Sequence, residues 1–131
     1  MARSPKEVAV FPEQEKILLV CVNKVYKTIN MYDAVRYSWP VKPEKAQEAK
    51  YVMAVFRGVI VGVFEADEWF PALKIHFPHL SPEHANWHKQ EGRFGFIGSS
   101  ASKDVEFLYL DKCVPKQWRF TGNSIRYVNF R

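Results

Sequence analysis

The chain has 131 residues, of which 47% are hydrophobic and 25% are charged, as is usual for one globular domain. A chain of this length can bury a hydrophobic core without disulfides or a metal, and its two cysteines, Cys21 and Cys113, are too few for a disulfide framework. No apolar segment opens the sequence, and no run is long enough to cross a membrane. We therefore expect a cytoplasmic protein without a membrane partner.

The net charge of +5 is concentrated near the end of the sequence. The last twenty residues contain no acid and five cations, which are Lys112, Lys116, Arg119, Arg126 and Arg131. The aromatic fraction of 15% is high, so we expect some rings at a surface or cleft. A basic surface with aromatic residues suits a polyanionic partner, and the alternative is a surface that only keeps the protein soluble.

Residues 1–15 are polar and contain two prolines, which predicts a loose lead-in to a single domain over residues 16–131. The apolar run at residues 17–22 has the length of a strand that is buried on both faces. A short helix is predicted over residues 31–37. Asn30 is its expected N-cap, and Trp39-Pro40 ends it because the residue before a proline avoids helical geometry.

A compact helix is predicted over residues 43–49, with Pro43 in its first position. Two strands follow at residues 51–56 and 59–64, because Val, Ile, Phe and Tyr suit a pleated, buried surface. Arg57-Gly58 predicts a tight turn between these strands. A Trp-Phe-Pro corner is predicted at residues 69–71.

The second half of the sequence predicts shorter elements. Residues 73–80 are irregular, a helix runs from Ser81 to near Gly92, and residues 94–97 form a short strand. Ser99 and Ser100 are expected to cap a helix over residues 103–110, whose apolar face is made by Val105, Leu108 and Tyr109. Closing strands are predicted at residues 117–120 and 125–130. The whole pattern predicts an α+β fold, with a small twisted, mostly antiparallel sheet or partly closed barrel and three or four short helices.

All four histidines fall within thirteen residues, at His76, His79, His84 and His88. On a helix, His84 and His88 would share one face, a spacing that suits zinc. However, no Cys-x-x-Cys or His-Glu-x-x-His pattern completes a ligand set. We expect no metal, and the alternative is a small metal-dependent hydrolase or nuclease that uses this cluster.

Other catalytic patterns are weak. Glu65, Asp67 and Glu68 are interpreted as a solvated turn, because adjacent carboxylates on a strand point apart. The Gly-Ser-Ser sequence at residues 98–100 lacks the Gly-x-Ser-x-Gly nucleophile pattern. The sequence contains neither a Walker loop nor a dinucleotide-binding fingerprint, so no cofactor is expected.

Several aromatic residues lie close to cations along the sequence, and rings can stack on nucleobases while cations hold phosphates. We expect phosphate contacts from a set of four arginines, Arg36, Arg93, Arg119 and Arg126. Base stacking is expected on Trp39 or Trp69. The alternative is that these tryptophans are core or rim residues of the fold.

Five ordered segments carry a family resemblance: residues 32–39 (YDAVRYSW), 49–55 (AKYVMAV), 58–64 (GVIVGVF) with Trp69, 93–98 (RFGFIG) and 125–129 (IRYVN). The series resembles the C-terminal accessory domain of certain bacterial GIY-YIG nuclease-like proteins, and it covers roughly residues 16–129. The Gly-Ile-Tyr and Tyr-Ile-Gly strands of the nuclease half are absent. The resemblance therefore implies a DNA- or RNA-associated accessory module without nuclease activity.

A weaker similarity, at the level of the fold, connects residues 51–69 with the PUA-like group, which includes the ASCH, EVE and YTH domains. Those domains are small barrels that bind RNA or modified bases. The leading hypothesis is accordingly a non-enzymatic nucleic-acid-binding module, with RNA or a modified base as one form of its ligand. The alternatives are the metal-dependent enzyme and a module that binds a protein partner or itself.

Overall fold

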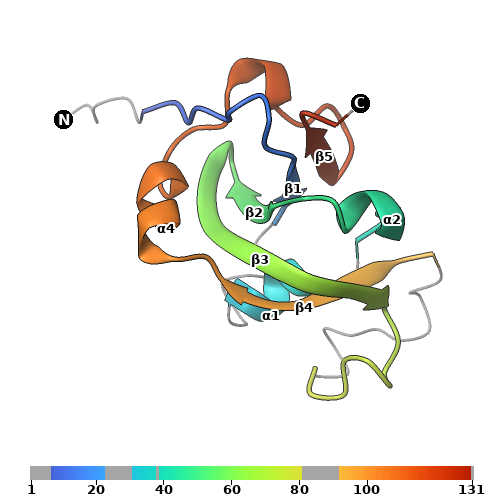
Figure 1. Ribbon diagram of the computed structural model, residues 1–131. Helices are drawn as coiled ribbons and strands as arrows, with labels where there is room; N and C mark the ends of the chain where they lie inside the picture. Colours follow the sequence, from blue (N-terminus) through green and yellow to red (C-terminus); the bar gives the residue numbers. More distant parts are fainter. Residues whose placement is uncertain (1–6, 23–30, 38, 81–91, 131) are drawn as a thin grey trace.

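A computed structural model describes residues 7–22, 31–37, 39–80 and 92–130 of the protein. Five strands form one open sheet with the order β4-β3-β2-β1-β5 (Figure 1). The strands are β1 (Ile17–Cys21), β2 (Tyr51–Phe56), β3 (Val59–Pro71), β4 (Phe94–Ser100) and β5 (Ile125–Val128). β1 and β2 run parallel, whereas the other neighbouring pairs are antiparallel. The predicted small α+β fold with a mostly antiparallel sheet is confirmed.

The helices in the described ranges are short. They are α1 (Met31–Arg36), α2 (Pro43–Ala46), α4 (Lys103–Tyr109) and a 3-10 helix, η3 (Lys116–Trp118). α1 and α2 lie where the sequence predicts helices, and Pro43 opens α2 because its missing N–H would have no helical partner there. The predicted helix between Ser81 and Gly92 and the predicted cap at Asn30 fall outside the described residues.

The β2–β3 hairpin forms as predicted, and its turn explains the Arg57-Gly58 pair. Both residues have positive φ, 50° at Arg57 and 80° at Gly58, which is the geometry of the tight turns that join twisted strands. β3 then continues farther than predicted. Figure 1 shows it as a long curved strand that changes partner, from β2 in its first half to β4 in its second half.

Two local predictions around β3 and β4 are wrong. The expected corner at residues 69–71 is the end of β3, where Trp69 pairs with Phe96 and Pro71 pairs with Phe94. Ser99 and Ser100 belong to β4, and the cap of α4 is Ser102, whose hydroxyl accepts from the Val105 N–H at 3.4 Å. In both places the pairing of β3 with β4 determines the structure, and the local turn signals do not.

The acid-free end of the sequence also differs from the prediction. Pro115 stands before η3, and the Trp118 N–H donates to the Pro115 carbonyl at 2.9 Å, so a helical turn replaces the first closing strand. β5 does form within the second predicted strand, and it pairs with β1. Glu65, Asp67 and Glu68 are exposed as expected, but they lie in β3 beside a bulge and not in a turn.

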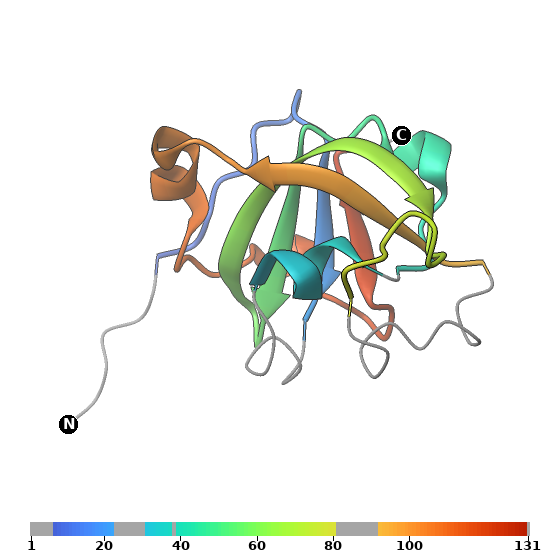
Figure 2. The same ribbon diagram turned by 90° about the horizontal axis from the view of Figure 1, so that it is seen from below.

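Both faces of the sheet are covered. Ile17 and Leu19 point to a core that includes Tyr109 of α4, while Leu18 and Val20 point to a core that includes Val35 of α1. A strand covered on both faces is apolar throughout, which explains the continuous run in β1. Figure 2 shows α1 and α4 on separate parts of the sheet. Of the apolar α4 face predicted from the sequence, Tyr109 is buried, whereas Leu108 is exposed.

The described part of the predicted lead-in, residues 7–15, packs against the domain. Ala9 is buried, and its N–H donates to the Cys113 carbonyl at 2.8 Å. Phe11 packs against the core at Tyr109, with 5.8 Å between the ring centres. Within the residues that the structure describes, no helix is long and apolar enough to cross a membrane.

Candidate nucleic-acid interface

Arg36 is a buried side chain at the end of α1. Its Nε donates to the Asp33 carboxylate at 2.9 Å, and its guanidinium lies 4.8 Å from the ring centre of Tyr32 and 5.4 Å from that of Phe77. Only 8% of the residue is exposed. The structure thus gives Arg36 a place inside the fold, where it neutralises Asp33 between two rings, and not on an open phosphate-binding surface.

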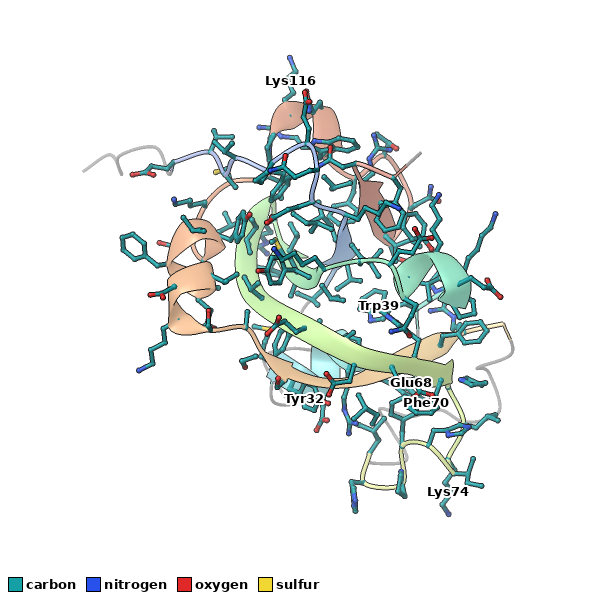
Figure 3. The ribbon with its side chains drawn as sticks, viewed as in Figure 1. Tyr32, Trp39, Glu68, Phe70, Lys74 and Lys116 are labelled. Atoms are coloured by element: carbon teal, nitrogen blue, oxygen red, sulfur yellow. The ribbon has the colours of Figure 1, made fainter. Side chains whose placement is uncertain are left out.

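Trp39 and Trp69 are also buried, with exposed fractions of 8% and 7%. The indole N–H of Trp39 donates to the Val35 carbonyl at 2.6 Å, and the Trp69 ring lies 5.1 Å from that of Phe96. In the view of Figure 3, Trp39 lies in the interior of the molecule, within the curve of β3. Neither ring offers an open face to a base in this conformation, as expected if the two tryptophans are core residues of the fold.

Arg93 is exposed directly before β4, where its carbonyl accepts from the Ala72 N–H at 2.9 Å. Arg93 and Arg126 belong to the two edge strands or their flanks, which are not neighbours in the sheet. Because Arg36 is buried, the four arginines predicted to hold phosphates do not form one exposed surface.

Arg119 and Arg126 both lie next to η3. The Arg126 guanidinium lies 5.5 Å from the ring centre of Trp118, and its Nη2 donates to the Gln117 carbonyl at 3.3 Å. Arg119 follows η3 directly and is exposed, as is Lys116, whose side chain points outward in Figure 3. We call Lys116, Trp118, Arg119 and Arg126 the C-terminal basic cluster.

Sequence reasoning placed only the two arginines of this cluster among the site residues. Lys116 is one of the five cations in the last twenty residues, and Trp118 lies between it and Arg119 in the sequence. The signal that connects them is Pro115, which can start a short helical turn and so can bring positions 116 and 119, three residues apart, to one side.

A second group of cations and rings lies where α2 meets β5. Lys45 Nζ is 4.3 Å from the ring centre of Tyr127, and Lys16 Nζ is 5.5 Å from that of Phe130. The sequence gives no local signal for this group, because its members are far apart along the chain. Lys16 is paired with the Glu48 carboxylate, so this surface carries both signs of charge and suits a polyanion less well than the C-terminal basic cluster.

The described residues contain no group of three or more His, Cys, Asp or Glu side chains able to hold an ion, so they offer no site for the metal-dependent alternative. His76 stacks on Phe70 at 4.9 Å between ring centres. His84 and His88 fall outside the described residues. The expectation that no metal is bound therefore stays a prediction.

No family model, curated protein or solved structure matches this chain. The resemblance to the accessory domain of GIY-YIG nuclease-like proteins and the similarity to PUA-like domains accordingly stay predictions. The functional argument rests on the geometry of the chain itself.

Proposed function

We propose that this protein is a non-enzymatic nucleic-acid-binding module that contacts phosphates through the C-terminal basic cluster. The observation that carries the proposal is that Arg126 lies over the ring of Trp118, which Lys116 and Arg119 flank in the sequence, in a segment without a single acid after Asp111. Cations in such a segment add their fields and attract a polyanion. A partly exposed indole beside them adds a surface on which a base can stack.

The nearby acids support this choice of surface. Glu15, whose carbonyl accepts from the Asn129 side chain, has a carboxylate that accepts from Lys50 at 3.1 Å and from the Tyr109 hydroxyl at 3.2 Å. Its charge is thus partly compensated within the fold. By contrast, the groove beside α4 is lined by three acids, Glu7, Glu106 and Asp111, together with two lysines, so its mixed charge suits phosphates less well.

Salt dependence tests the proposal. Three phosphate contacts predict that log affinity falls with log salt with a slope of about −2 for single strands, and non-specific dissociation constants are roughly micromolar to 100 micromolar. Fluorescence polarisation with a labelled single-stranded oligonucleotide measures this slope. Lys116→Ala should reduce its magnitude by about 0.7, as expected for one lost contact.

Lys74→Ala is the matched control. Lys74 is an exposed lysine like Lys116, and Figure 3 shows the two at opposite ends of the molecule. Both variants lose one charge, so net charge alone would change the slope equally in each. A slope that is unchanged in Lys116→Ala, or changed equally in Lys74→Ala, would contradict the proposed surface. Folded protein without any binding at low salt would remove the function.

A second candidate function, self-association, is favoured by a different observation. The groove beside α4 is bordered by Phe107, which is 83% exposed, and residues 7–10 present Val10, which is 79% exposed. The groove carries both acids and the cations Lys103 and Lys112, so two copies could match charges about a two-fold axis. Sedimentation of the wild type and of Phe107→Glu measures this: a dimer that forms in the wild type and is lost in the variant supports it.

A further inference from the structure

A pocket of about 280 Å³ opens where β1 and β2 end side by side. Its walls are made by Cys21, Val55, Gly58, Val114, Arg119 and Phe120. Pockets for drug-sized ligands measure about 300–1,000 Å³, so this one is suited to a smaller group. Apolar atoms make most of the wall, and Arg119 is its charged side chain.

The pocket is built on the sheet and is preformed. The Val114 N–H donates to the Gly58 carbonyl at 2.9 Å, and the Cys21 N–H donates to the Ser124 carbonyl at 2.8 Å. Val55 and Val114 are 1% and 2% exposed, so the bottom of the pocket is part of the core. Gly58 keeps one side open, because a Cβ there would meet no atom within 4 Å. Walls held in this way need little ordering when a ligand binds.

The walls suit the face of a flat aromatic group that lies beside an anion. Phe120 contributes an aromatic wall, and burial raises the pKa of the Cys21 thiol, which keeps that wall neutral. Arg119 is exposed, and it has no ion-pair partner among the described residues. It also belongs to the C-terminal basic cluster, so the pocket opens beside the surface proposed to hold phosphates.

We infer that this pocket receives one unpaired base of a single-stranded nucleic acid while Arg119 holds an adjacent phosphate. The inference rests on the proposed function and limits its ligand to single-stranded nucleic acid. A paired base is stacked inside a duplex and must be extruded before it can enter such a pocket, whereas a base in a single strand is free to do so. The protein should therefore prefer single strands to duplexes.

The experiment plugs the pocket reversibly. In a Cys113→Ser variant, Cys21 becomes the single cysteine, and a benzyl thiosulfonate at about pH 9 converts its thiol to a bulky mixed disulfide. Binding of a labelled oligothymidylate and of a duplex is then measured. The plug should weaken binding of the single strand by about tenfold, the worth of one stacked base, and leave duplex binding unchanged. Reduction with dithiothreitol should restore the binding of the single strand.

A free nucleotide has the same base and phosphate, so deoxythymidine monophosphate and inorganic phosphate serve as competitors. Competition by the nucleotide but not by phosphate supports a base pocket, and an oligothymidylate that binds at least about tenfold tighter than the nucleotide identifies the strand as the source. Equal competition by both would contradict the inference, because Arg119 alone would then account for binding.

The failures are distinguishable. Salt-dependent binding that is the same before and after plugging overturns the pocket and leaves the proposed function standing. No oligonucleotide binding by the unmodified protein removes the proposed function itself. Should the plugged protein unfold, Cys21→Leu fills the same space with a smaller group. A Cys21→Leu protein with a wild-type melting curve and wild-type preference for single strands also overturns the inference.

Discussion

The guanidinium of Arg126 lies over the indole ring of Trp118, 5.5 Å from its centre. One residue belongs to β5 and the other to η3, so this contact ties the two ends of the acid-free segment together. It holds Arg126 against η3, which contains Lys116 and is followed directly by Arg119. Replacement of Arg126 should therefore change both the stability of the fold and the charge of the C-terminal basic cluster.

Arg126→Gln is expected to lower both binding and stability, by different amounts. If Arg126 holds one phosphate, the salt slope should decrease in magnitude by roughly 0.7–0.9. A cation–π contact near the surface stabilises by about 0.5–1 kcal/mol, so the melting temperature should fall by only a few degrees. Salt titration and thermal melting measure the two effects. An unchanged salt slope would show that Arg126 only supports Trp118.

Trp39→Ala is expected to act through stability. The indole is 8% exposed and donates to the Val35 carbonyl, so its loss leaves a large cavity and an unpaired acceptor. Truncation of a buried Trp costs about 3–5 kcal/mol, which denaturant unfolding measures. Trp39→Phe, which keeps an apolar ring, should lose less. If Trp39→Ala kept wild-type stability and still lost oligonucleotide binding, the ring would have to contact the ligand directly.

The tryptophans show where sequence reasoning reaches its limit. A Trp next to a cation suggests a stacking surface, but the same ring can fill a core, and only tertiary placement separates the two. Trp39 forms a bridge with Phe94, and Trp69 pairs with Phe96, so both are fixed by β4, which comes later in the sequence. No local pattern around Trp39 or Trp69 contains that information.

Ser102→Ala is expected to loosen the start of α4. Its hydroxyl accepts from the Val105 N–H, and loss of an N-cap typically costs about 0.5–2 kcal/mol; the 3.4 Å distance favours the lower end. Thermal melting should fall by a few degrees. Ser100→Ala is the control, because Ser100 belongs to β4 and is exposed. An equal loss in Ser100→Ala would contradict the placement of the cap.

The elements that could be predicted are those whose local signals agree. The β2–β3 hairpin has apolar strands and a glycine turn, and α2 has its proline in the first position. Elements whose form depends on a distant partner could not be predicted. The second half of β3 is a strand because β4 pairs with it, and residues 117–120 form no strand because Pro115 starts a helical turn. The C-terminal basic cluster follows from that same turn, so only its charges were visible in the sequence.

Stability should decline at high pH through two buried tyrosines. Burial raises the pKa of both Tyr37 and Tyr109 from 10.0 to about 12, and for Tyr109 the neighbouring Glu15 carboxylate adds to the effect. Between these values the unfolded chain releases protons that the folded protein keeps. The free energy of unfolding therefore has its full value below about pH 10 and falls toward pH 12. Denaturant unfolding along a pH series measures the decline. Tyr37→Phe and Tyr109→Phe keep the rings and remove the titrating groups, so each should make the decline shallower. A wild-type slope in the double variant would assign alkaline unfolding to other groups.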